Sequence, residues 1–235
     1  MPKRVLIVVT SHANMGNTEA KTGIWVEELA VPYYRFVDAQ IEAEIASPLG
    51  GPAPLEPKSI KSQGENDPAV DRFLSDTTAR QQLVATRRLA DVDVREFDAL
   101  FFPGGHGTMW DLPVDESVRQ AVEQAEAAKR IIAAVCHGPA GLTKAKRPDG
   151  QPLVAGKRVS AFTNREEDAV GLTRVVPFLL ETRLRELGAQ FQNGADWQSF
   201  AVRDGRLITG QNPASSAAVA ELVMAALNEH ETKAA

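Results

Sequence analysis

The stretch RIIAAVCHGPAGL, residues 130–142, joins a run of apolar residues to a reactive pair of side chains. Ile131 to Val135 are all apolar and predict a buried strand of a parallel sheet. Cys136 and His137 follow at once, and AGLTKA (140–145) looks helical. A polar pair in this place is explained by a strand-to-helix turn that presents a nucleophile, with a helix N-terminus behind it.

Strand and helix patterns alternate along the rest of the chain. Pro32 lies inside the first predicted helix and predicts a kink or break there. Asp204-Gly205 separates two β-rich runs and predicts a hairpin over 199–210. Further strands are expected at 4–10, 42–47, 99–103 and 158–163, and helices at 25–40, 68–90, 114–128, 176–189 and from Pro213 onward.

A segment rich in glycine and proline, residues 48–67, interrupts the alternation and predicts a long loop. Together with the residues up to 95 it looks like an insertion between two core strands, a small cap. We therefore expect residues 1–235 to form a single α/β domain. Its predicted architecture is a flavodoxin-like three-layer sandwich with a mainly parallel sheet and a cap insertion at about 48–95.

Composition excludes several classes of protein. The 235 residues carry a formal net charge of −5 without a basic stripe, which disfavours nucleic-acid binding. No apolar run approaches membrane-spanning length, and the N-terminus lacks the features of a signal peptide, so a cytoplasmic location is expected. The chain has one cysteine, which rules out an intramolecular disulfide and cysteine-based zinc clusters.

Polar segments follow several of the predicted strands. They are the loop at 11–23, GGHGT at 104–108, CHGP at 136–139 and TNREED at 163–168. Ligands of an open parallel sheet bind outside the carboxyl ends of its strands. We therefore expect these segments to meet at one site.

The Cys136 sulfur should be reactive, because a following helix N-terminus favours the thiolate. A buried structural thiol is the alternative. His137 is placed to act as its acid or base partner, and such an imidazole needs a third group to hold its tautomer. Glu166, Glu167 and Asp168 are the candidates, and a surface acidic cluster is the other interpretation.

Two glycines and two carboxyls complete the candidate site. Gly104 and Gly105 allow a ligand close to the backbone, and their amides are candidates for an oxyanion hole together with the amide after Cys136. Glycines that serve only the turn are the alternative. His106 either binds substrate or caps its loop. Of Glu27 and Glu28, one should face inward with a raised pKa, while the other faces solvent.

Several motifs together resemble the PfpI-like, class I glutamine-amidotransferase-like superfamily, and most closely its heat-shock glyoxalase III and chaperone branch. The motifs are TGIWVEELAVPY, FFPGGHGTMWDLP, AVCHGPAGL, SAFTNREED and ITGQNPAS. The resemblance implies that Cys136 is the nucleophile, His137 its partner, Glu167 the third member and Glu28 a protonated carboxyl beside the thiol. It also implies that the amides of Gly105 and His137 bind the oxyanion.

The resemblance also implies an activity: conversion of methylglyoxal, a small 2-oxoaldehyde, to lactate without glutathione, metal or cofactor. Deglycase or stress-chaperone activity and a homodimer are further expectations from this branch. The downstream His-x-Glu of the glutaminases is missing, which argues against glutamine hydrolysis. The competing hypotheses are a cysteine peptidase or amidase of the PfpI type, and a non-enzymatic holding chaperone or thiol redox sensor.

Overall fold

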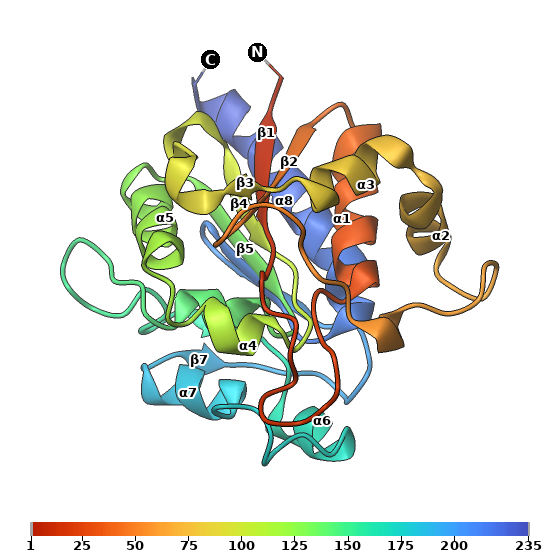
Figure 1. The fold of residues 1–235 in the computed structure, drawn as a ribbon. Helices are drawn as coiled ribbons and strands as arrows, with labels where there is room; N and C mark the ends of the chain where they lie inside the picture. Colours follow the sequence, from red (N-terminus) through yellow and green to blue (C-terminus); the bar gives the residue numbers. More distant parts are fainter. Residues whose placement is uncertain (1, 235) are drawn as a thin grey trace.

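The computed structural model describes residues 2–234, and the side chains of residues 2–229, as a sheet covered by helices on both faces (Figure 1). The sheet consists of β1 (Arg4–Val8), β2 (Glu42–Ser47), β3 (Arg87–Arg88), β4 (Ala99–Phe102), β5 (Ile131–Val135), β8 (Ala201–Asp204) and β9 (Leu207–Gly210). Their order is β3-β2-β1-β4-β5-β9-β8. Neighbouring strands pair in parallel, except that β8 is antiparallel to β9.

Helices form the two outer layers. One face of the sheet packs against α1 (Val26–Asp38), α3 (Thr77–Val84) and α8 (Ser216–Ala234), and α2 (Pro68–Ser75) packs against α1. The other face packs against α4 (Thr108–Asp111) and α5 (Glu116–Ala127), and α7 (Leu180–Glu186) adds Leu180 and Leu184 to the same core from the end of the molecule. The short helix α6 (Asn164–Ala169) lies at the end of the molecule opposite the start of β1 (Figure 1).

Short elements complete the chain. The 3-10 turns are η1 (Pro57–Ser59), η2 (Leu89–Asp91), η3 (Val94–Glu96), η4 (Gly138–Leu142) and η5 (Pro213–Ser215). A separate two-stranded parallel sheet consists of β6 (Arg158–Val159) and β7 (Gln190–Phe191).

Strand β5 shows why the buried strands are apolar at every position. In β5, Ile131, Ala133 and Val135 belong to the core on the α1 and α8 side. Ile132 and Ala134 belong to the core on the α5 side. Successive side chains of a strand point to opposite faces, so a sheet covered on both faces needs apolar residues at every position.

The strand order of the sheet determines where a ligand site can form. The chain proceeds from β1 outward to β2 and β3, and then returns to build β4, β5 and β9 on the other side of β1. This reversal between β1 and β4 opens a crevice at the carboxyl ends of the strands, where ligands bind in open α/β sheets. The α/β sandwich expected from the sequence is confirmed.

Local signals in the sequence account for several elements. Asp115 caps α5 by accepting hydrogen bonds from the amides of Ser117 and Val118. Gly188 follows the end of α7 with a φ of 85°, as expected for the glycine that ends a helix. The hairpin of β8 and β9 turns at Gly205.

Other boundaries were wrong. Helix α1 does not break at Pro32, because both halves of the helix pack on the same core, and the kink expected there stays a prediction. The single helix expected at 68–90 is divided by Asp76, whose carboxylate caps α3. The expected strand at 158–163 ends at Val159. The next amide, that of Ser160, donates to the Thr209 hydroxyl rather than to the backbone of a neighbouring strand.

Two helices also differ from expectation. Helix α7 begins at Leu180 rather than at residue 176, and Pro177 disfavours helical backbone at the residue before it. The helix expected at 140–145 is the 3-10 turn η4, which begins at Gly138.

The segment 48–95 supplies β3 at the edge of the sheet and the helices α2 and α3 beside α1. Its role as a cap stays a prediction. None of the helices within residues 2–234 combines the length and the apolar character needed to cross a lipid bilayer.

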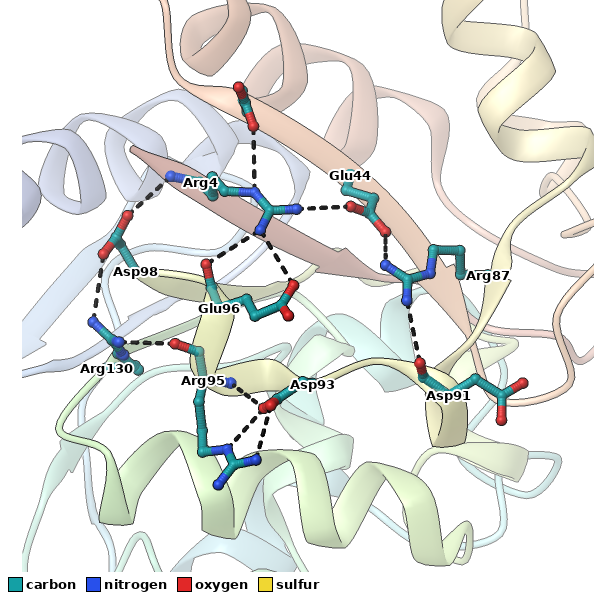
Figure 2. Close-up of polar contacts among 10 residues, drawn as sticks. Arg4, Glu44, Arg87, Asp91, Asp93, Arg95, Glu96, Asp98 and Arg130 are labelled. Carbon is teal, nitrogen blue, oxygen red and sulfur yellow. Dashed lines mark hydrogen bonds and ion pairs between the residues drawn. The ribbon is translucent and has the colours of Figure 1, made fainter. Parts of the chain in front are cut away.

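Ion pairs gather at the amino ends of the strands (Figure 2). The Arg4 guanidinium pairs with the carboxylates of Glu42, Glu44 and Glu96 at 3.3–3.4 Å. Its carbon also lies 4.5 Å from the centre of the Phe97 ring. Arg4 therefore connects the start of β1 with β2 and η3.

Candidate active site

Cys136 occupies a sharp turn between β5 and η4. Its φ is 58°, a conformation that costs a residue with a side chain of order 1–3 kcal/mol. Hydrogen bonds hold it on both sides, because its amide donates to the Gly210 carbonyl and its carbonyl accepts from the Phe162 amide. Gly138 allows the chain to turn so tightly: a Cβ there would lie 2.2 Å from the Phe102 oxygen.

His137 lies between the thiol and a carboxylate. Its Nδ1 is 3.3 Å from the Cys136 sulfur, and its Nε2 is 2.8 Å from Oε2 of Glu167. Since a carboxylate only accepts, the Nε2–H donates to Glu167 and a neutral imidazole keeps Nδ1 as an acceptor toward the sulfur. This geometry suits a general base for the thiol.

Glu167 is the acidic group that contacts His137. Its other oxygen lies 2.9 Å from Nε2 of His106, so one carboxylate accepts from two imidazoles. Burial opposes its charge, but His137 and His106 outweigh burial and hold the pKa of Glu167 well below its ordinary value. Glu166 has other partners, and Asp168 is exposed.

Burial lowers the pKa of His137, and the neighbouring His106 ring lowers it further. The His106 and His137 ring centres are 4.1 Å apart. His137 is therefore neutral near pH 7, as a base that accepts the thiol proton must be.

Glu28 is fully buried on α1, beneath the thiol. Its Oε2 accepts a 2.7 Å hydrogen bond from the Gly104 amide, and its Oε1 has no hydrogen-bond partner among the described residues. Burial raises the pKa of Glu28 to about 8. Glu28 is therefore protonated at neutral pH, and the Cys136 thiol is among the groups that act on its pKa.

The expectation that the turn lowers the thiol pKa was wrong. Burial raises the pKa of Cys136 well above its ordinary value, and the charge of Glu28 raises it further where that carboxyl is ionised. The His137 amide does favour the thiolate, but the loss of solvent outweighs it. The thiol therefore stays protonated near pH 7, and a nucleophilic role for it requires a neighbouring base to take its proton.

The two glycines of the 104–108 loop differ in what they offer. The Gly104 amide is bound to Glu28, so Gly104 is not an oxyanion donor as had been expected. Gly105 has a φ of 97°, and a Cβ there would lie 2.2 Å from the Gly23 oxygen. Gly105 lines the cavity beside Cys136, and its amide stays a predicted oxyanion donor.

A cavity of about 310 Å³ opens beside the thiol. Its lining residues, all in the described part of the chain, include none from 48–95. They are Trp25, Glu27, Gly105, His106, Cys136, His137, Phe162, Val170, Trp197, Asn212, Pro213 and Ala214.

Several of these lining residues were not expected from the sequence. Glu27 was expected to face solvent if Glu28 faced inward, but it is half-buried and lines the cavity. Burial raises its pKa, and so does nearby Asp67. Trp25 and Asn212 lie within the quoted motifs TGIWVEELAVPY and ITGQNPAS, which had signalled family resemblance without roles for these positions. Trp197 lies outside every quoted motif.

His106, His137 and Glu167 also form a group able to hold a metal ion, with one ligand atom from each lying within 4.8 Å of the others. The same atoms already pair with one another through hydrogen bonds, so an ion there would replace the contacts of His137 described above. The expectation of a metal-free site stays a prediction.

Known proteins are similar to this chain over almost its whole length. The chain is 30% identical over 224 residues to the glutathione-independent glyoxalase HSP31 of Saccharomyces cerevisiae, covering 92% of this chain and 94% of that protein. It is 31% identical to the glutathione-independent glyoxalase hsp3101 of Schizosaccharomyces pombe, with 93% of each chain covered.

Among solved structures, glyoxalase III from Candida albicans matches with a TM-score of 0.87 and 28% identity, covering 95% of this chain and 97% of that one. The Francisella tularensis protein REP24 matches with a TM-score of 0.91 and 41% identity, covering 96% and 99%. The sequence model of the DJ-1/PfpI family matches residues 22–226. The resemblance seen in the sequence is thus confirmed, and the chain belongs to the DJ-1/PfpI family.

Proposed function

We propose that this protein is a glutathione-independent glyoxalase of the glyoxalase III type, which converts methylglyoxal to lactate. The observation that carries the proposal is the line of contacts from the Cys136 sulfur through His137 to Glu167, at the edge of a small cavity. The glyoxalase names of relatives that match over nine-tenths of both chains support it.

The reaction begins with the thiol. The Cys136 sulfur attacks the aldehyde carbon while its proton passes to Nδ1 of His137. Negative charge develops on the aldehyde oxygen, where the amides of Gly105 and His137 stabilise it. His137 then returns the proton to that oxygen, which gives a neutral hemithioacetal.

A proton shift completes the internal redox change. His137 removes the hydrogen of the former aldehyde carbon as a proton and passes it to the ketone oxygen, which gives an enediol. The hydroxyl proton of the first carbon then moves, again through His137, to the former ketone carbon. The first carbon is oxidised to a thioester and the second is reduced to an alcohol. Water then cleaves the thioester, which releases lactate and restores the thiol, so the balance needs no outside oxidant or reductant.

His137 is the better candidate for this shift than Glu28. His137 lines the cavity, whereas Glu28 is fully buried and is not among the lining residues. In this proposal, protonated Glu28 orients the sulfur and is a positioning residue.

The test is lactate formation from methylglyoxal, without glutathione, by protein dialysed against a chelator. We expect turnover by the unaltered protein and loss to the uncatalysed rate in Cys136→Ala. Leu49→Ala, at an exposed residue outside the cavity, should retain full activity. Full activity in Cys136→Ala would refute the proposal.

No specific observation favours a second function. A peptidase needs an extended groove, whereas this cavity is compact, and a fluorogenic peptide screen with Cys136→Ala tests that alternative. Deglycase or chaperone activity and a homodimer stay predictions.

A further inference from the structure

We propose that the apolar side of the cavity binds the aromatic substituent of an aryl 2-oxoaldehyde, and that Trp197 is the residue that sets this preference. The inference rests on the proposed function, since it names a substrate class for the same site. It gives a role to Trp197 and to the Gln211–Asn212 pair, for which the mechanism above has none.

An aromatic surface extends outward from the reacting groups. The Phe162 ring centre lies 4.4 Å from that of His137, and the Trp197 ring meets Phe162 edge-on at 5.6 Å. Trp25 and Val170 add further apolar lining. Methylglyoxal offers this surface one methyl group, whereas an aromatic ring attached to the ketone carbon would cover it.

Trp197 is held in a conformation that tryptophan seldom adopts. Its φ is 62°, yet its side chain remains 45% exposed at the rim of the cavity. Strain of this kind persists where the surroundings fix the backbone, and it concentrates at ligand-binding sites. Asparagine or glycine would meet the backbone requirement at lower cost, so the turn alone does not explain a large aromatic residue here.

A buried polar network fixes the loop. Oε1 of Glu166 accepts from the Trp197 amide at 2.9 Å, from Nε2 of Gln211 at 3.0 Å and from Nδ2 of Asn212 at 2.9 Å. All three of these polar side chains have no exposed surface.

The same network fastens the loop on both sides of Trp197. Oε1 of Gln211 accepts from the Gly194 amide, and Nδ2 of Asn212 donates to the Gln198 carbonyl. Trp197 therefore does not need to be ordered when a substrate binds, which lowers the entropic cost of binding.

Phenylglyoxal is the probe for this class. Its conversion to mandelate follows the steps given for methylglyoxal: one water is added, the aldehyde carbon is oxidised to the carboxylate and the ketone carbon is reduced to the alcohol. The phenyl ring forms and breaks no bond, but it is conjugated with the ketone and changes the intrinsic reactivity. The comparison is therefore made between protein variants, for which this intrinsic difference is the same.

The kinetic test compares kcat/KM for phenylglyoxal with kcat/KM for methylglyoxal. We expect this ratio to fall about tenfold in Trp197→Asn, because asparagine tolerates the backbone but removes the ring; tenfold corresponds to about 1.4 kcal/mol. Trp197→Phe should recover most of the ratio, and Leu49→Ala should not change it. An unchanged ratio in Trp197→Asn would overturn the inference.

A binding measurement separates the inference from the proposed function. In Cys136→Ala, calorimetry should show tighter binding of mandelate than of lactate, and Trp197→Asn should abolish the difference. If neither aldehyde is turned over but this difference is found, the glyoxalase proposal fails and the aromatic subsite stands. If lactate is formed but mandelate binds no more tightly than lactate, the subsite is refuted and the glyoxalase proposal stands.

Discussion

At Glu167, one carboxylate holds two imidazoles, and only one of them contacts the thiol. Glu167→Gln removes the negative charge and an acceptor of the Nε2–H of His137, so the imidazole loses the group that fixes its tautomer. We expect kcat/KM for methylglyoxal to fall roughly 100-fold. Because Glu167 also raises the pKa of His137, the acidic limb of the pH profile should move to lower pH.

Asp168→Asn is the matched control for this variant. Asp168 lies next in the chain, carries the same type of charge and is exposed. Its amide variant should keep both the rate and the pH profile of the unaltered protein. Equal losses of kcat/KM in the two variants would mean that the overall negative charge of α6 matters, rather than the contact of Glu167 with His137.

The buried Glu28 carboxyl makes the free energy of unfolding decrease as the pH rises. Its pKa rises from 4.5 to about 8 on folding. Below pH 4.5 the carboxyl is protonated in both states, and as the pH rises toward 8 the unfolded chain releases the proton that the folded protein keeps. Stability from this group is therefore lost across that range, at no more than about 1.4 kcal/mol per pH unit.

Glu28→Gln tests this, because the amide is neutral at every pH and has a similar shape. The free energy of unfolding of the unaltered protein, relative to Glu28→Gln, should decrease between pH 5 and 8. Urea unfolding at several pH values measures it. A constant difference across that range would show that Glu28 is not protonated in the folded protein.

Among the elements, the 3-10 turn η4 contains two glycines with different surroundings. A Cβ on Gly138 would lie 2.2 Å from the backbone oxygen of Phe102, whereas a Cβ on Gly141 would lie 3.3 Å from the Phe102 ring. Gly138→Ala should therefore destabilise the protein by about 3 kcal/mol or more, and Gly141→Ala by about 1 kcal/mol or less. Thermal and urea unfolding compare them, and equal losses would contradict this account.

Elements with local signals were the ones that sequence could predict. The apolar run of β5, the Asp115 cap of α5 and the Asp204-Gly205 turn each act within a few residues. The division at Asp76 and the early end of β6 depend on partners elsewhere: Tyr34 donates to the Asp76 carboxylate, and Thr209 takes the Ser160 amide.

The residues of the candidate site also fall into those that the sequence could predict and those that only the folded structure reveals. Cys136 and His137 adjoin one strand end, and the resemblance supplied Glu28 and Glu167. The role of the Gly104 amide and the position of Trp197 at the cavity rim follow from the folded structure, through contacts 76 and 31 residues apart in sequence. No local pattern encodes contacts of that separation.

Across the whole molecule, the reacting groups and the ion pairs around Arg4 lie at opposite ends of the sheet. Cys136 follows the carboxyl end of β5, whereas Arg4 begins β1 at the amino end (Figures 1 and 2). Residues of the amino end should therefore affect stability without affecting catalysis.

Arg4→Met tests this separation, because methionine keeps an apolar contact with Phe97 but leaves Glu42, Glu44 and Glu96 without their shared cation. We expect a loss of about 1 kcal/mol in the free energy of unfolding, since the pairs are partly exposed. The loss should shrink in 1 M salt, which screens the remaining repulsion, while kcat/KM for methylglyoxal stays unchanged.

Arg95→Met is the control for this network variant. Arg95 pairs with Asp93 two residues away, and its side chain is 70% exposed, so its removal should change the stability by about 0.5 kcal/mol or less. If Arg4→Met costs no more than Arg95→Met, the three-carboxylate cluster adds nothing beyond an ordinary surface pair. If Arg4→Met lowers kcat/KM with the fold intact, the two ends of the sheet are coupled, and the stabilising and reacting groups are not independent.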